Sequence, residues 1–223
     1  VVVTTIQELF SLNKLFSLCT MTKILVAFYS MYGHNFAMAS SAAAGAKEAG
    51  ATVDLKRIPE TLPTEVLEKM HAVEAQKAFA DVPLVVVAEL GDYDGIIIVA
   101  PTRFGSVCAQ VQSFLDQTGQ LWFTGKLVGK IASAMVSTAT QHGGQETTFS
   151  TLHNFFMHQG MVITGLPGAF AGVNDVSEMH GLTPYGATTI TGSDGSRMPS
   201  QLELDGAKFQ GKHVATLATK LKQ

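Results

Sequence analysis

Charged side chains are scarce in this sequence of 223 residues: Asp, Glu, Lys and Arg together make up 15% of it, against about 25% in an average globular protein. Hydrophobic residues reach 46%, so we expect a large core and no long disordered region. The formal net charge is −3, and no run of basic residues occurs. Because nucleic acids and anionic membrane surfaces attract clustered Lys and Arg, we expect neither as a partner.

Cysteine and long apolar runs are also scarce. Cys19 and Cys108 are too few for a disulfide framework and lack the spacing of metal ligands, so we expect no metal site and assign Cys108 to packing. The longest apolar runs, such as residues 84–88 and 96–100, are far shorter than the roughly 20 residues of a membrane span. A reducing, cytoplasmic location fits these features best.

Residues 1–20 form an apolar or amphipathic leader ahead of a strand pattern that opens at Met21. The leader has neither the basic start nor the Ala-x-Ala-like end of a secretory signal, and Lys14 is its single cation. We therefore interpret residues 1–20 as an N-terminal extension outside the domain, and residues 21–223 as a single domain.

Buried strand patterns alternate with helical spacings along that domain. Strands are predicted at residues 23–29, 51–57, 96–100, 130–136 and 161–164, and helices at 35–50, 64–71, 106–118 and 145–158. Residues 83–90 are ambiguous, because 84–88 also suit a strand. Ser200 and Glu203 form a capping box that begins a final helix with one apolar stripe. Five strands with alternating helices predict an α/β fold with an open, doubly wound parallel sheet, since a barrel would need eight such units.

In the order 2-1-3-4-5, which is one of the common orders of doubly wound sheets, the first, third and fourth strands are neighbours, and ligands bind beyond their carboxyl ends. The loop after the first strand comprises Ser30, Met31, Tyr32, Gly33, His34 and Asn35 and runs directly into a helix. The helix start offers free N–H groups to an anion, Gly33 permits a tight turn, and Ser30 and Asn35 add polar side chains. No Lys or Arg occurs between Lys23 and Lys47, so a phosphate would be held by amides and hydroxyls. An ordinary βα turn is the alternative.

The loop after the third strand comprises Pro101, Thr102, Arg103, Phe104 and Gly105. A rigid proline, a hydroxyl, a cation and an aromatic ring can together clasp one face of a flat heterocycle. Arg103 could stabilise negative charge that develops on a reduced ring such as a flavin. The alternative is an arginine that satisfies helix-end carbonyls or makes a surface ion pair.

The loop after the fourth strand is rich in hydroxyls and glycine. Its residues are Ser137, Thr138, Ala139, Thr140, Gln141, His142, Gly143 and Gly144. Such a run brings many donors to the polar edge of a ligand, whereas a flexible loop with capping residues would explain only part of it. No local motif indicates a Ser or Cys nucleophile, so the chemistry would belong to a bound cofactor.

The sequence resembles the WrbA family of flavoprotein NAD(P)H:quinone oxidoreductases from Met21 to Lys222. The resemblance rests on seven segments in the same order, residues 29–34, 56–61, 101–105, 114–119, 141–146, 183–190 and 192–197. It implies a flavodoxin-like fold, non-covalent FMN, and two-electron transfer from NADH or NADPH to a quinone in a ping-pong relay. It also implies a homotetramer, a dimer of dimers, whose active sites are completed by neighbouring chains.

The resemblance also implies roles for individual residues. Ser30 to Asn35 would hold the FMN phosphate, with Tyr32 also near the nicotinamide. Thr102 to Phe104 and the loop from Ser137 to Gly144 would contact the isoalloxazine ring. His158 matches a family histidine near the ring, and Trp122 matches an aromatic residue on the substrate side. Ala139, where the family usually has glycine, and Gln159, in place of the second member of a His-His pair, depart from the family pattern.

An electron-carrier flavodoxin that docks on protein partners is the main alternative function. Such carriers are usually strongly acidic, which steers them toward basic partners. The net charge of −3 and the added stretch at residues 165–197 argue against that role. A regulatory protein-binding module has no specific support in the sequence.

Overall fold

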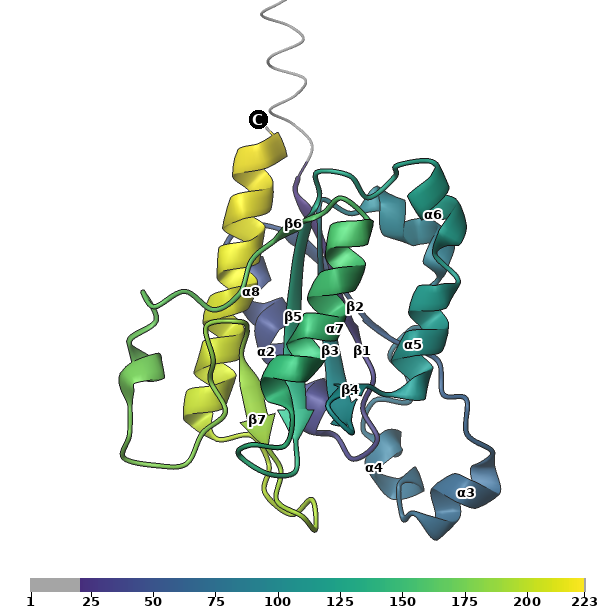
Figure 1. The fold of residues 1–223 in the computed structure, drawn as a ribbon, viewed down its shortest axis with the longest axis vertical. Helices are drawn as coiled ribbons and strands as arrows, with labels where there is room; N and C mark the ends of the chain where they lie inside the picture. Colours follow the sequence, from purple (N-terminus) through teal and green to yellow (C-terminus); the bar gives the residue numbers. More distant parts are fainter. Residues whose placement is uncertain (1–20, 223) are drawn as a thin grey trace, which may run out of the picture.

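Parallel strands form the centre of this computed structural model, which describes residues 21–222 (Figure 1). Along the sheet lie β2 (Thr52–Arg57), β1 (Lys23–Phe28), β3 (Gly95–Arg103), β5 (Ile131–Thr138) and β6 (Val162–Ile163). Counted as the five strands of the main path, this order is 2-1-3-4-5, so the predicted sheet is confirmed. The predicted leader, residues 1–20 with Cys19, lies outside the described residues.

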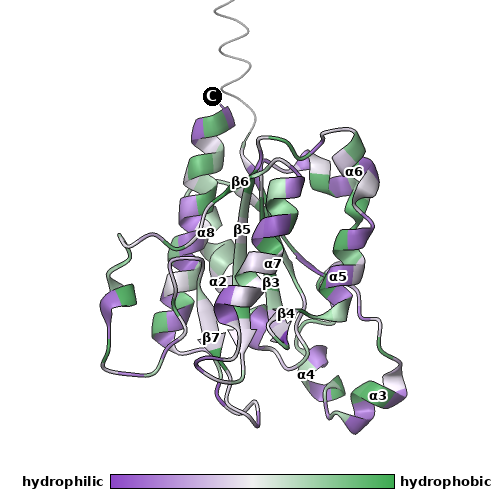
Figure 2. Cartoon of the chain, in the orientation of Figure 1, coloured by the Kyte–Doolittle hydropathy of each residue, from purple (hydrophilic) through white to green (hydrophobic). Residues whose placement is uncertain are grey.

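The strand period of two residues divides the side chains of β1 between two cores. Leu25 and Ala27 pack on the face covered by α5 (Ala109–Asp116) and α7 (Gln145–His158). Ile24, Val26 and Phe28 pack on the opposite face, under α2 (His34–Glu48) and α8 (Gln201–Lys222). All five side chains are fully buried, which explains why the strand reads as a continuous apolar run. Helices such as α8 and α5 carry both hydrophobic and hydrophilic residues around their surfaces (Figure 2).

Two glycines allow α2 and α8 to approach each other closely on one face of the sheet. A Cβ atom at Gly45 would lie 1.8 Å from the carbonyl oxygen of Lys208, and one at Gly211 would lie 2.0 Å from that of Ala42. Only glycine fits at either contact. The contact fixes the position of α2, whose first turn forms part of the site described below.

The remaining helices are short and lie in the connections. They are α3 (Thr64–Lys69), α4 (Val73–Lys77), α6 (Gly119–Phe123) and the 3₁₀ helices η1 (Val87–Asp92) and η2 (Ala171–Asn174). The ambiguous residues 83–90 divide between two structures, because Leu84 makes an isolated parallel bridge with Arg57 before η1 begins. No helix within residues 21–222 is both long enough and apolar enough to cross a membrane. Cys108 is buried in the core under α5, so its predicted packing role is confirmed.

The predicted helix at residues 106–118 begins too early. Ser106 and Val107 instead form β4 (Ser106–Val107), which pairs antiparallel with the end of β3. Phe104 and Gly105 have φ values of 53° and 80°, so two consecutive residues in the left-handed region reverse the chain as a tight hairpin. The helix α5 starts only after this hairpin, at Ala109.

The fifth strand, predicted at residues 161–164, is divided in two. β6 pairs with the first residues of β5, and β7 (Thr188–Ile190) pairs in parallel with its last residues, Val136 to Thr138. Residues 164–187 form an excursion between the two pieces. The sequence pattern missed β7 because its Thr-Thr-Ile sequence is short and mostly polar, and is buried only by tertiary packing.

Candidate functional site

A cavity of about 330 Å³ lies at the carboxyl edge of the sheet, where four segments converge. The loop after β1 and the carboxyl ends of β3 and β5 contribute many of the residues selected from the sequence, because both strands run further than predicted. These are Ser30, Met31, Tyr32, His34, Asn35, Pro101, Thr102, Arg103, Ser137, Thr138 and Ala139. A fourth segment, residues 191–195, forms the remaining wall. The three loops therefore meet at one cavity, and the fourth wall follows β7.

The start of α2 gives the cavity an end whose geometry suits an anion. Gly33 precedes the helix with φ 95°, and its N–H donates to Ser30 Oγ at 3.0 Å, which closes a tight turn. The first N–H groups of an α-helix have no acceptor within the helix. No acidic residue occupies the first turn of this helix, so its positive dipole end is not neutralised by the helix's own side chains.

Asn35 has an unsatisfied group at the same end of the cavity. Its side chain is 2% exposed, and its Nδ2 donates to the Tyr29 carbonyl at 3.0 Å. Its Oδ1 is buried and has no hydrogen-bond partner within the described chain. Because a buried acceptor without a partner is destabilising, this oxygen is suited to a hydroxyl or N–H donor on a ligand.

His34 connects the start of α2 to the fourth wall. Its Nε2 lies 3.0 Å from the Gly195 carbonyl oxygen, which can only accept, so Nε2 must carry a proton. Burial lowers the pKa of His34, and the carbonyl contact offsets this shift only partly. The ring is therefore a neutral bridge between two walls of the cavity near neutral pH.

The predicted loop at residues 101–105 begins within β3, which includes Pro101 to Arg103, and only part of it faces the cavity. Pro101, Thr102 and Arg103 line the cavity, while Phe104 is fully exposed at the hairpin tip, and neither Phe104 nor Gly105 is among the lining residues. Thr102 Oγ1 contacts Thr148 Oγ1 of α7 at 2.8 Å, which holds the hairpin against that helix. The Arg103 guanidinium is exposed and donates to the Thr102 carbonyl at 2.9 Å.

The predicted loop at residues 137–144 likewise has only some of its residues at the cavity, and its first two residues belong to β5. Ser137, Thr138 and Ala139 line the cavity, but Thr140, Gln141, His142, Gly143 and Gly144 do not. Thr138 Oγ1 donates to the Thr140 carbonyl at 2.8 Å, which turns the chain outward, and Gly144 precedes α7 with φ 96°. Within one chain, these five residues therefore form the turn into α7.

His158 and Trp122 lie at the other end of the molecule. The 14-residue helix α7 runs from the cavity edge to His158, a rise of roughly 20 Å. His158 lines a second hollow between α5 and α7, together with Gln112 and Asp116. Trp122 is 58% exposed on α6, which lies near the top of Figure 1, whereas the cavity loops lie at the bottom. Neither side chain reaches the cavity of its own chain.

Two groups near the cavity were not selected as site residues from the sequence. The first is the 191–195 wall, of which residues 192–195 belong to one of the segments that carry the family resemblance. The second is Glu60, which accepts hydrogen bonds from the Tyr29 hydroxyl at 2.7 Å and from Gln110 at 2.8 Å, and so supports the residue before the first loop. Burial, followed by the Glu60 contact, raises the pKa of Tyr29. Glu60 follows β2, so sequence position alone did not associate it with the cavity.

The fold and the cavity define an α/β protein of the flavodoxin-like class, with its site beyond the carboxyl ends of the strands. Solved structures agree with this class. A WrbA-like flavodoxin from Agrobacterium tumefaciens is similar with a TM-score of 0.60 and 22% identity, covering 89% of this chain and 98% of that one. Oxidised flavodoxin 1 from Bacillus cereus is similar with a TM-score of 0.55 and 16% identity, covering 86% and 97%.

Sequence relatives define the family more narrowly. The family model of NADPH-dependent FMN reductases matches residues 23–174. A protein named NAD(P)H dehydrogenase (quinone) from Geobacter metallireducens is 56% identical over 201 residues, covering 90% of this chain and 99% of the relative. A protein of the same name from Aromatoleum aromaticum is 55% identical over 200 residues, covering 89% and 97%. The chain therefore belongs to the NADPH-dependent FMN reductase family, and the resemblance to the WrbA-type quinone oxidoreductases is confirmed.

Proposed function

We propose that this protein is an FMN-dependent NAD(P)H:quinone oxidoreductase that uses the cavity at the carboxyl edge of the sheet. The start of α2 carries this proposal, because it combines unpaired helix N–H groups with the buried, unpartnered Oδ1 of Asn35. The relatives named NAD(P)H dehydrogenase (quinone), which match the chain over nearly their whole length, support the same reaction.

The residues of the cavity fit FMN. A phosphate suits the helix start, where Gly33 leaves open space and the Ser30 turn exposes backbone N–H groups. The Asn35 Oδ1 needs a donor, which a ribityl hydroxyl can supply. No Lys or Arg lies between Lys23 and Lys47, so the anion would be held by the helix dipole and amides rather than by a neighbouring cation.

The remaining cavity residues would hold and polarise the ring system. Bound FMN would supply the two-electron chemistry of the reaction. Arg103 would place a positive charge beside the cavity, where negative charge develops on reduction, and Thr102 and Ser137 would offer hydroxyls at the edge. NAD(P)H and quinone would occupy the open side in turn, with Tyr32 beside the nicotinamide. The Tyr32 hydroxyl donates to the Met70 carbonyl at 3.1 Å, which would hold the Tyr32 ring in place.

We further propose a cytoplasmic homotetramer in which neighbouring chains complete each site. His158, Trp122 and the outer part of the loop after β5 lie outside the cavity of their own chain, so a role at the ring requires another copy. Between Lys130 and Asp175 the sole ionisable acid is Glu146, with no Lys or Arg, and interface cores are depleted in charge. Residues 21–223 would act as one domain in each copy.

Titration with FMN and a coupled turnover assay test the function. FMN fluorescence should be quenched at one equivalent per chain. Without oxygen, the loaded protein should oxidise more than one equivalent of NADH or NADPH per FMN only when benzoquinone is present as acceptor. A clear preference for FAD would overturn the proposed cofactor. Tight FMN binding without NAD(P)H oxidation would favour the electron-carrier alternative. A stable monomer with full quinone reductase activity in light scattering would defeat the tetramer.

A further inference from the structure

The fourth wall of the cavity has little apolar surface with which to hold its position. Its five residues are Thr191, Gly192, Ser193, Asp194 and Gly195. Gly192 and Gly195 have positive φ values of 78° and 72°, and none of the five residues is buried. Because hydrophobic packing cannot order such a loop, polar contacts from its neighbours must do so.

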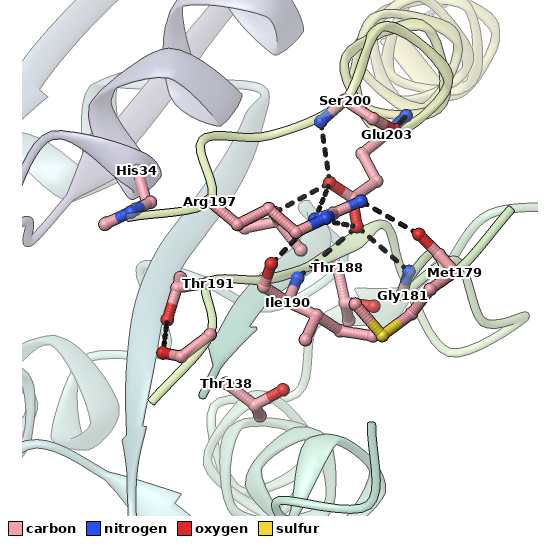
Figure 3. A network of polar contacts seen from close by, with 12 residues as sticks. His34, Thr138, Met179, Gly181, Thr188, Ile190, Thr191, Arg197, Ser200 and Glu203 are labelled. Atoms are coloured by element: carbon pink, nitrogen blue, oxygen red, sulfur yellow. Dashed lines mark hydrogen bonds and ion pairs between the residues drawn. The ribbon is translucent and has the colours of Figure 1, made fainter. Parts of the chain in front are cut away.

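Glu203, near the start of α8, lies behind this wall with its side chain fully buried (Figure 3). Its carboxylate accepts from five donor groups, two of which belong to adjacent residues of β7. These are the N–H groups of Gly181 (3.1 Å), Ile190 (3.3 Å) and Ser200 (2.8 Å), the Thr189 hydroxyl (2.8 Å) and the Arg197 guanidinium (2.9 Å). A capping box accounts only for the Ser200 contact, so this glutamate does far more than start a helix.

Arg197 pairs with Glu203, and we call these two side chains the clamp. One guanidinium nitrogen, Nη1, donates both to Glu203 and to the Ile190 carbonyl, the latter at 2.6 Å. The other, Nη2, donates to the Met179 carbonyl at 2.9 Å. Ile190 precedes the 191–195 wall and Arg197 follows it, so the pair fixes both ends of the loop (Figure 3).

The clamped loop reaches two other walls of the cavity. The Thr191 N–H donates to the carbonyl of Thr138, the last residue of β5, at 2.8 Å. The Gly195 carbonyl accepts from His34 at the start of α2. A shift of the clamp would therefore move the wall that adjoins the end of the cavity at the start of α2.

We propose that Arg197 and Glu203 are positioning residues that set FMN affinity by holding the 191–195 wall, although neither side chain lines the cavity. The proposal rests on the proposed function, since it takes FMN as the ligand. Removing Arg197 leaves the buried Glu203 carboxylate uncompensated, and removing the Glu203 charge leaves the partly buried Arg197 without its partner, so each single substitution should release the loop. Arg197→Lys keeps the charge but lacks the fork that reaches Glu203, Ile190 and Met179 together.

The test compares Glu203→Gln, Arg197→Met, Arg197→Lys and the double variant Glu203→Gln/Arg197→Met with the natural protein. The matched control is Asp94→Asn, which removes an ion pair with Lys222 (2.8 Å) at the other end of α8. The measurements are the FMN dissociation constant below the unfolding transition and hydrogen exchange of residues 190–197 without FMN.

Each Arg197 or Glu203 single variant should raise the FMN dissociation constant, by about tenfold or more for Glu203→Gln and Arg197→Met. Exchange at residues 190–197 should rise before FMN is added, and the double variant should bind no more weakly than the weaker single one. Asp94→Asn should lower the unfolding temperature and leave FMN affinity within about twofold.

Unchanged FMN affinity in Arg197→Lys and in the folded members of the other variants would overturn the positioning role, as would equal weakening by Asp94→Asn. If Glu203→Gln does not fold, Arg197→Lys decides the matter. Failure of the natural protein to bind FMN would instead overturn the proposed function, and this inference with it. Normal binding by the natural protein and by its variants would overturn this inference alone.

Discussion

Replacing Asn35 by Ala should show whether this side chain, at the start of α2, contacts a ligand or only stabilises the fold. The substitution removes the Nδ2 donor to the Tyr29 carbonyl, which stabilises the folded state by about 0.5–1.5 kcal/mol. It also removes the buried Oδ1 that has no partner, which relieves a cost of about 1–3 kcal/mol. The two effects oppose each other, and their sum runs from a loss of about 0.5 kcal/mol to a gain of about 2.5 kcal/mol, so the free energy of unfolding without FMN should not fall appreciably.

FMN binding should respond much more strongly. If a ligand hydroxyl pairs with Oδ1, the bound state loses about 1–3 kcal/mol in the variant, which raises the FMN dissociation constant roughly 5- to 150-fold. The Asn35→Asp variant should bind FMN more weakly still, because a carboxylate would repel the phosphate at the same helix start.

Urea denaturation without FMN and fluorescence titration with FMN measure the two quantities. Gln210→Leu is the matched control: this buried amide is fully hydrogen-bonded and lies outside the cavity, so its loss should reduce stability and leave FMN affinity unchanged. A large loss of stability in Asn35→Ala with unaltered FMN affinity would refute the reasoning, since Asn35 would then act only as a loop anchor.

Three further predictions concern charge, pH and the far end of the molecule. Arg103→Ala should weaken FMN by about 1.5–3 kcal/mol and slow quinone turnover; unchanged titrations and rates would make Arg103 an ordinary surface cation. Burial lowers the pKa of His153, so the folded state resists a proton that the unfolded chain accepts near its usual value of about 6.5. The contribution of His153 to the free energy of unfolding should therefore be fully present above that pH and be lost as the pH drops below it. The fall should be shallower in His153→Gln. Identical urea denaturation profiles at pH 7.5 and 5.5 for both proteins would contradict this. Trp122→Ala should raise the quinone KM more than it weakens FMN, and the reverse pattern in steady-state kinetics would place Trp122 away from the substrate side.

The central strands of the sheet could be located from the sequence because the information that marks them is local, whereas their order was taken from the class of doubly wound sheet. Each central strand is buried on both faces, which leaves a continuous apolar run such as that of β1, and the helix α7 begins and ends where its period predicts. The loop after β1 could be selected for a similar reason. Its Gly33 turn, its polar residues and the helix that follows are adjacent in the chain, so their joint geometry follows from local rules.

Tertiary structure alone decided the fourth wall and what holds it. Residues 191–195 follow β7, whose Thr-Thr-Ile sequence has no strand signature and is ordered by pairing with β5. Glu203 carries a recognisable capping signal, yet four of its five contacts come from segments up to 22 residues away, which no periodicity encodes. In the same way, the position of His158 depends on the direction in which α7 leaves the cavity. Local preferences therefore specified the strands and the turn at the start of α2, whereas the long-range polar contacts that complete the cavity exist only once the chain has folded.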